Sequence, residues 1–183
     1  MRLIIAIAAS AILAATTAGA ATPHNTTRGT PMTTEARLQR MEDIHDIGRT
    51  LTDYGRFLDA REFRNYADLF AKDGVWDGGF GAAKGPQAIF DMMTRNIGDG
   101  KGGGGMPAGS YHLLTNFEID VHGDTAKAWS RWSFVIRAPE GGGARILVAG
   151  RYEDDLVRED GRWKFKLRKV SADVEMPAPA PAK

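Results

Sequence analysis

Residues 111–121, Tyr-His-Leu-Leu-Thr-Asn-Phe-Glu-Ile-Asp-Val, decide the fold because apolar and polar side chains alternate along them. A period of two is typical of a β-strand with one face against a core. The alternation predicts an apolar row of Tyr111, Leu113, Phe117, Ile119 and Val121. His112, Leu114, Asn116 and Glu118 fall on the opposite face. There a polar side chain such as His112 meets either a pocket or solvent.

The chain after this stretch predicts three more strands joined by tight turns. Gly123-Asp124 leads into a strand that carries Trp129 and Trp132, and Gly141-Gly142-Gly143 leads into a strand over 145–157. Asp160-Gly161 is a strong hairpin signal. It precedes Trp163, Phe165 and Leu167, which alternate with Lys164, Lys166 and Arg168. The second half of the chain is therefore predicted to be an antiparallel sheet.

The chain before this stretch predicts helices. Apolar residues recur every three or four positions from Leu38 to Leu58, which indicates one long amphipathic helix. A second helix is expected to bury Phe63, Tyr66, Leu69 and Phe70 and to end at Asp73-Gly74, before a short strand over 75–77. Gly85-Pro86 opens a third helix, with proline near its first position. Helices followed by a strand meander predict an α+β fold, with the helices on one face of a curved sheet.

The two ends of the chain differ from its middle. Arg2 followed by an apolar run of about 13 residues and an Ala-x-Ala site predicts a signal peptide over 1–20, cleaved after Ala20, and not a membrane span. The polar stretch 21–33 predicts a flexible lead-in, and the Pro/Ala-rich stretch 175–183 predicts a mobile tail. The domain itself is expected over 34–174. We therefore expect a secreted or periplasmic protein without a stable membrane anchor after cleavage.

Composition excludes several classes of function. The chain has 183 residues, no cysteine, 24 basic and 23 acidic side chains, and a net charge of +1. Without cysteine there is no disulfide, thiolate metal site or cysteine nucleophile. The near-neutral charge argues against a nucleic-acid partner. The four histidines lack metal-binding spacings, and neither a phosphate-binding loop nor a Gly-x-Ser-x-Gly elbow is present. We expect neither a metal nor a cofactor.

Several phrases, in this order, resemble one known family. They are Tyr54-Gly-Arg-Phe-Leu-Asp59, residues 66–76 (YADLFAKDGVW), His112 with Asn116, residues 123–128 (GDTAKA), residues 150–154 (GRYED), and Asp160-Gly-Arg-Trp163. Residues 35–174 resemble the nuclear transport factor 2-like superfamily, in particular its SnoaL-like branch. The resemblance implies an α+β barrel in which a cone-shaped, bent antiparallel sheet wraps around helices and leaves a pocket at its open mouth. It also implies a homo-oligomer, a trimer or a dimer.

Within this superfamily the chain resembles the cofactor-free lyases scytalone dehydratase and bile acid 7α-dehydratase. That resemblance implies a catalytic set of His112 as general base or acid, Asp59 as its orienting carboxylate and Tyr54 as oxyanion donor. Two departures concern the substrate. Leu58 stands where scytalone dehydratase has a tyrosine, and Arg151 and Tyr152 stand near the place of its second histidine.

Each of these residues also has a purely structural interpretation. Residues five apart on a helix lie about 140° apart around the axis, so Tyr54 and Asp59 share a pocket only if the helix ends at Asp59. Tyr54 can instead pack in the core, and Asp59 can cap the next helix through the pattern Asp59-Ala-Arg-Glu62. An aromatic or apolar pocket wall is expected from Trp76, Phe80, Met106 and Trp132, each of which can equally be core. Arg151 can bind an anionic or phenolate group, or pair with Asp154 or Glu153 at the surface.

These observations predict two functions of different class. The first is a cofactor-independent lyase (a dehydratase or other eliminating enzyme) or isomerase. Its substrate would be small, apolar and hydroxylated, of an aromatic or polycyclic kind. The alternative is a non-catalytic ligand-binding or accessory domain that uses the same cone.

Overall fold

The computed structural model describes residues 32–98, 109–138 and 141–174. The predicted signal peptide over 1–20, nearly all of the predicted lead-in, the glycine-rich loop from residue 99 on, Met106 and the predicted tail over 175–183 lie outside these ranges.

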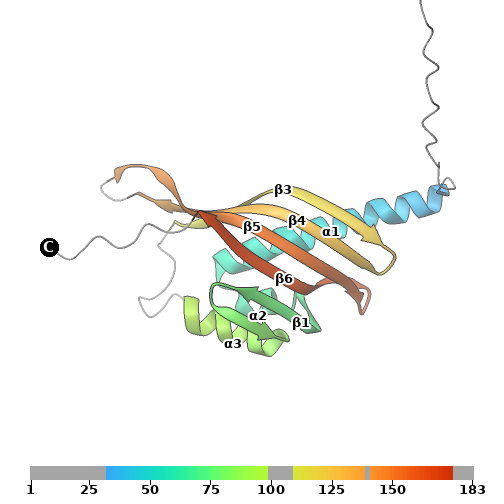
Figure 1. Cartoon of the computed structure of the whole chain (residues 1–183), viewed down its shortest axis with the longest axis horizontal. Helices are drawn as coiled ribbons and strands as arrows, with labels where there is room; N and C mark the ends of the chain where they lie inside the picture. The colour runs from blue at the N-terminus through green and yellow to red at the C-terminus, as the bar shows by residue number, and fades with distance from the viewer. Residues whose placement is uncertain (1–31, 99–108, 139–140, 175–183) are drawn as a thin grey trace, which may run out of the picture. The chain divides into compact units, whose positions relative to one another are not determined.

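The predicted long helix is confirmed as α1, Thr34–Ala60 (Figure 1). Thr33 caps its start, because the Thr33 hydroxyl accepts a hydrogen bond from the backbone N–H of Ala36 at 3.2 Å. The helix ends where Arg61 takes a left-handed conformation, with φ of 59°. Its buried stripe comprises Ile47, Leu51, Tyr54 and Leu58, and packs against the sheet.

The predicted second helix is too long. Helix α2 covers only Phe63–Ala67, and Phe70 begins strand β1, Phe70–Gly78, which runs through Asp73-Gly74 without a turn. A distant strand overrides the local turn signal, because Phe70 pairs with Phe165. A Cβ on Gly74 would lie 2.4 Å from the carbonyl oxygen of Phe165, so glycine allows this close approach. A short strand β2, Gly81–Lys84, which the sequence did not indicate, pairs with β1 before helix α3, Pro86–Ile97.

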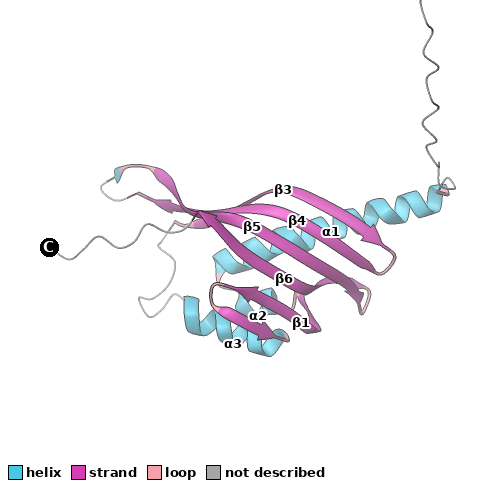
Figure 2. Ribbon diagram, in the orientation of Figure 1, coloured by secondary structure: helices cyan, strands magenta, loops and turns pink. Residues whose placement is uncertain are grey.

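The four long strands after α3 confirm the predicted meander. They are β3 (Tyr111–His122), β4 (Thr125–Arg137), β5 (Ala144–Glu159) and β6 (Arg162–Val174). The six strands form one curved, unclosed sheet in the order β2-β1-β6-β5-β4-β3, antiparallel except for the parallel pair β1–β6. Helix α1 runs along one face of β3–β6, while α2 and α3 lie beside β1 (Figure 2). The α+β prediction is thus confirmed.

Two of the register shifts in the sheet change which of the predicted side chains face the helices. Pairing between β3 and β4 jumps from Thr115–Arg131 to Glu118–Trp129, and Asn116 takes a φ of 56°. One extra residue moves every later side chain to the other face. The predicted single apolar row of 111–121 is therefore wrong. Side chains on the inner face, toward α1, are His112, Leu114, Ile119 and Val121, whereas Tyr111, Leu113 and Phe117 are exposed.

The second bulge has the same effect on β6. Pairing between β5 and β6 jumps from Asp155–Leu167 to Leu156–Phe165, which leaves Lys166 as the extra residue. Arg168 consequently lies on the inner face with Phe165, not beside Lys164 and Lys166 as the alternation predicts.

A buried carboxylate connects α1 to the turn end of the sheet. Asp43 accepts hydrogen bonds from the side chains of Gln39, Arg158 and Trp163. Burial on its own would raise the pKa of Asp43, but these bonds hold it below its ordinary value. In the described part of the chain, every helix is too short or too polar to cross a membrane.

Candidate functional site

The structure brings Asp59 and His112 into direct contact. Asp59 lies next to last in α1, and His112 is the second residue of β3. One oxygen of the carboxylate is 2.7 Å from His112 Nδ1, and the other accepts the backbone N–H of His112 at 2.9 Å. The side chains are 11% (His112) and 22% (Asp59) exposed, so water has limited access to the pair.

This contact selects one form of the imidazole. A carboxylate can only accept hydrogen bonds, so the proton of neutral His112 lies on Nδ1 and Nε2 keeps its lone pair. The second bond, to the backbone, holds the carboxylate in place. The ring is flanked by Phe134, with ring centres 4.9 Å apart, and more loosely by Trp132 at 6.2 Å. The arrangement can take a proton at Nε2 and stabilise the resulting imidazolium.

The capping interpretation of Asp59 is wrong in this structure. Helix α2 starts after Glu62 without a side-chain capping bond, and the Asp59 carboxylate is occupied by His112. Asp59 lies next to last in α1, which ends at Ala60, and its carboxylate faces β3.

Tyr54 does not join this pair by a hydrogen bond. Its hydroxyl oxygen accepts the indole N–H of Trp76 at 2.9 Å, and its ring packs 4.6 Å from Tyr66 and 5.4 Å from Tyr152. Burial raises the pKa of Tyr54, and the positive charge of Arg168 opposes that rise only in part. The phenol therefore stays protonated and keeps its own hydrogen for donation.

A buried ion pair beneath Tyr54 was missed by the sequence analysis. Arg168 Nε and Nη2 bind the two oxygens of Asp154 at 2.8 and 2.6 Å, and both side chains are 0% exposed. The guanidinium carbon lies 3.9 Å from the ring centre of Tyr54 and 4.1 Å from that of Tyr152. Burial raises the pKa of Asp154 and Arg168 opposes the rise. No local signal indicates this pair, because the bulge at Lys166 creates it.

The expected pocket wall is only partly assembled. Trp76 and Trp132 are buried, and Trp132 stacks on Tyr152 at 5.8 Å. Phe80 is 49% exposed and stacks on Trp76, with ring centres 5.8 Å apart. Arg151 lies on the outer face of the sheet, where it pairs with Asp173 and approaches Glu153 at 3.8 Å, so it is not brought to His112.

Met106 lies outside the described residues. Phe134 was missed by the sequence analysis, although it lies two positions after Trp132 and therefore shares its face.

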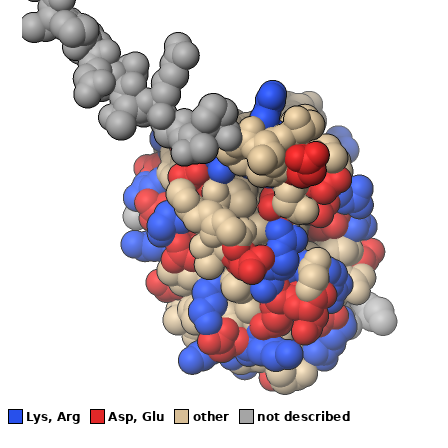
Figure 3. Space-filling view, turned by 90° about the vertical axis from the view of Figure 1, so that its right-hand side faces the viewer, with Lys and Arg blue, Asp and Glu red and all other residues tan. Residues whose placement is uncertain are grey.

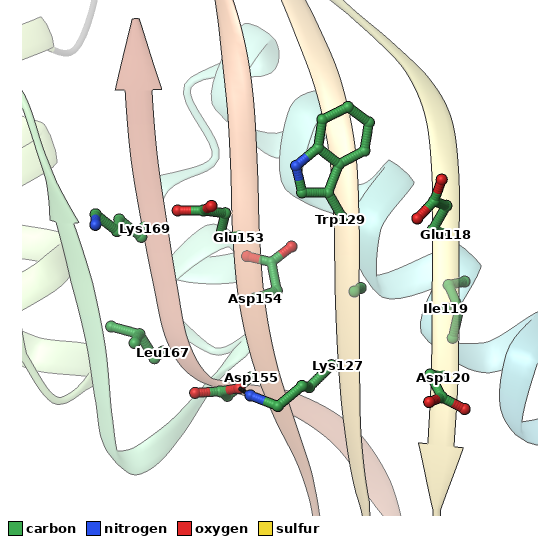
Figure 4. A pocket seen from close by; sticks show the side chains of 11 residues that line it. Glu118, Ile119, Asp120, Lys127, Trp129, Glu153, Asp154, Asp155, Leu167 and Lys169 are labelled. Carbon is green, nitrogen blue, oxygen red and sulfur yellow. Dashed lines mark hydrogen bonds and ion pairs between the residues drawn. The ribbon is translucent and has the colours of Figure 1, made fainter.

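Two hollows in the described part of the chain lie away from His112. The larger, of about 500 Å³, crosses the outer face of β3–β6 around Trp129 (Figure 4). Carboxylates of Glu118, Asp120, Glu153 and Asp155 line it together with Lys127 and Lys169. The smaller, of about 280 Å³, lies between α1 and the start of β6. Among residues 32–98, 109–138 and 141–174, no cluster of three or more histidine or acidic side chains could hold a metal.

Comparison with family models gives one match that spans most of the chain. The model of the SnoaL-like domain matches residues 39–169, which include Asp59, His112 and all six strands' central parts. Among proteins of curated function, none matches the chain in sequence.

Three solved structures with the same fold are each less than 25% identical to this chain. An NTF2-like protein with a cystatin-like fold from Novosphingobium aromaticivorans is 23% identical, with a TM-score of 0.65 over 76% of this chain and 87% of that one. A protein from the same organism, provisionally assigned as a scytalone dehydratase, is 24% identical, with a TM-score of 0.61 over 79% and 99%. LinA is 21% identical, with a TM-score of 0.57 over 80% and 96%.

Proposed function

Because the chain belongs to the SnoaL-like domain family, we propose that it is a cofactor-independent lyase or isomerase that uses His112 and Asp59 for acid–base chemistry. The contact of the Asp59 carboxylate with the backbone N–H and the ring Nδ1 of His112 carries the proposal. Aromatic neighbours on the imidazole favour a small, apolar, hydroxylated substrate of an aromatic or polycyclic kind.

The proposed elimination balances with these residues alone. His112 Nε2 removes a proton from the carbon next to the one that bears the hydroxyl, and Asp59 stabilises the imidazolium that forms. The electron pair of the broken C–H bond forms the double bond as the C–O bond breaks. The imidazolium then gives its proton to the departing hydroxyl, which leaves as water. In the isomerase version, the same proton returns to a different carbon of the substrate.

Tyr54 is proposed as a donor to the developing oxyanion. Its support is indirect: Trp76 occupies a lone pair of the Tyr54 oxygen, so the phenol hydrogen is directed elsewhere. Packing of Tyr54 among Tyr66, Tyr152 and Arg168 favours the core interpretation equally.

The test starts from binding and proceeds to turnover. A thermal-shift screen of aromatic and steroid-like alcohols should find a ligand, since binding raises the apparent stability. Mass spectrometry then follows loss of water or a change of isomer. His112→Ala should abolish turnover and retain ligand binding, whereas His122→Ala, on the exposed end of the same strand, should keep both. Unchanged turnover in His112→Ala would refute the proposal.

The alternative, a non-catalytic binding domain, is favoured by one observation. Aromatic side chains fill the inner face around Tyr54, and both hollows above lie elsewhere. This alternative predicts a ligand that binds but is recovered chemically unchanged.

We further propose that the chain is exported and cleaved after Ala20. The support is the Arg2, apolar and Ala-x-Ala order of its first 20 residues. Mass measurement of the N-terminal peptide, recovered from the periplasm or the medium, should begin at Ala21. A peptide that begins at Met1 and stays with the cells would contradict export.

The outer face of β3–β6 is the proposed surface for a homo-oligomer, a dimer or a trimer. Within the described part of the chain no helix covers this face, and it exposes Tyr111 and Leu113. Light scattering should give a multimeric mass that Leu113→Glu lowers. Leu38→Glu, at an equally exposed position on α1, is the matched control and should leave the mass unchanged. A monomeric wild-type protein would contradict the proposal.

A nucleic-acid partner is not proposed. On the face seen in Figure 3, acidic and basic side chains are intermingled without a continuous basic area. Binding through phosphate neutralisation needs such an area.

A further inference from the structure

Gly55 occupies an unusual place for a glycine. It is buried inside α1, five residues before the helix ends at Ala60, and within a helix glycine is the least favourable residue after proline. A Cβ built on Gly55 would lie 2.9 Å from Cδ1 of Leu114, closer than carbon atoms in real structures approach. Helix α1 and strand β3 therefore meet at a point where the helix has no side chain.

This contact lies next to the Asp59–His112 pair along the same seam. Asp59 follows Gly55 by four helix positions, which keeps it on the same side of the helix and about 6 Å further along. His112 precedes Leu114 by two strand positions, which keeps it on the same face and about 7 Å away. The distance from Gly55 to Asp59 along the helix is similar to the distance from Leu114 to His112 along the strand. The Gly55–Leu114 contact and the Asp59–His112 contact are therefore neighbours between α1 and β3.

We propose that Gly55 is a positioning residue: its missing side chain lets α1 lie close enough to β3 for the Asp59 carboxylate to reach the backbone N–H and the ring Nδ1 of His112. A side chain at position 55 would meet the end of the Leu114 side chain, which can turn aside in part, and the remaining added volume would move the helix outward at the contact next to the pair. Both bonds of the carboxylate, 2.7 Å to Nδ1 and 2.9 Å to the backbone nitrogen, would lengthen, because the carboxylate is carried by the helix. An effect of Gly55 on catalysis rests on the function proposed above, whereas its effect on the distance between Asp59 and His112 does not.

The chain contains its own control for a change of glycine within α1. Gly48 lies seven positions earlier in the same helix, and a Cβ there would have nothing within 4 Å. Replacement of Gly48 and of Gly55 by the same residue changes helix propensity equally. Only the Gly55 variant places atoms against Leu114.

The measurement is the nitrogen-15 NMR spectrum of the His112 imidazole in the full chain, without any substrate. The wild-type protein should show one neutral form with the proton on Nδ1. Gly55→Leu should convert this to a mixture of the two neutral forms, and Gly55→Ala should shift it part of the way. Gly48→Leu and Gly48→Ala should keep the wild-type spectrum. Leu114→Ala added to Gly55→Leu should restore it, because the removed methyl groups make room.

A wild-type imidazole spectrum in folded Gly55→Leu or Gly55→Ala would overturn the inference. An equal change of the imidazole spectrum in the Gly48 variants would overturn it as well. If Gly55→Leu does not fold, Gly55→Ala with and without Leu114→Ala decides the question. Because no reaction is measured, failure here leaves the His112→Ala test of the proposed function untouched, and failure there leaves this one untouched.

Discussion

Loss of either partner of the buried Arg168–Asp154 pair should have unequal consequences. Asp154→Asn leaves a guanidinium that is 0% exposed without its counter-ion. Arginine does not release its proton, and the neighbouring carboxylate and phenols raise the pKa of Arg168 further against the effect of burial. An unpaired buried charge costs about 3–5 kcal/mol. For a domain of this size, that loss lowers the Tm by on the order of 10 °C.

Arg168→Met should cost less and should depend on pH. Asp154 can take up a proton, and burial already raises its pKa while Arg168 opposes the rise. Without Arg168 the pKa rises further. The folded state then keeps a proton that the unfolded state has released, so the free energy of unfolding falls as pH rises from the ordinary aspartate value toward the raised one. At low pH the variant carries a neutral acid and recovers part of its stability relative to wild type.

Denaturant and thermal unfolding between about pH 4 and about pH 8 distinguish the two cases. Relative to wild type, the unfolding free energy of Arg168→Met should fall progressively as the pH rises across this range. That of Asp154→Asn should be lowered by the same amount at every pH. The double variant Asp154→Leu with Arg168→Met should fall close to wild type or above it, since a well-packed apolar pair often equals a buried ion pair. A cost below about 1 kcal/mol for Asp154→Asn is typical of exposed pairs and would refute the reasoning.

Three further predictions concern the scaffold. The hydrogen bonds to Asp43 hold its pKa below the ordinary aspartate value, so they stabilise the fold fully at pH values above the ordinary pKa. This stabilisation is lost as the pH falls through the lowered pKa. The difference in unfolding free energy between wild type and Asp43→Asn should therefore disappear in acid. Gly150→Ala should cost about 2 kcal/mol in denaturant unfolding, because its Cβ would lie 1.9 Å from the carbonyl oxygen of Ser171, whereas Gly79→Ala has open space and should be close to neutral. Asn116→Gly should keep the stability of the β3 bulge, and Asn116→Val should lower it by about 1–2 kcal/mol in the same assay, since φ is 56° there.

The parts of the fold that local pattern determines could be predicted. The periodicity of α1, the proline at the start of α3 and the Asp160-Gly161 hairpin act over a few residues, and the structure has each of them. The extent of β1 could not be predicted, because Phe70 and Gly74 owe their conformation to β6, far away in the chain.

Faces of strands were predictable only as far as the first bulge. Alternation assigns His112 and Leu114 to one face correctly relative to each other, but it fails beyond Asn116. The same failure hid Arg168, whose place on the inner face depends on an extra residue at position 166. A bulge depends on pairing with the neighbouring strand, so a single sequence carries little sign of it.

The sequence allowed the residues of the candidate site to be predicted, but it did not allow their contacts with one another to be predicted. His112 and Asp59 came from a family resemblance, and the structure joins them through two hydrogen bonds. Tyr54 was predicted beside them, yet its bond is to Trp76, since a helix residue five positions from Asp59 points toward the middle of the sheet.

The parallel pairing of β1 with β6 has a consequence for the order of folding. Strands β3 to β6 are joined by hairpins, so they can form from contacts between chain neighbours. Pairing of β1 with β6 must close a loop that contains β2, α3 and β3 to β5, and the Asp59–His112 contact joins residues 53 positions apart. Closing such long loops costs conformational entropy before the contacts that compensate for it have formed. We therefore expect the β3–β6 meander to form before Asp59 and His112 come into contact. His112 should be able to act as an acid or base only after this late step of folding.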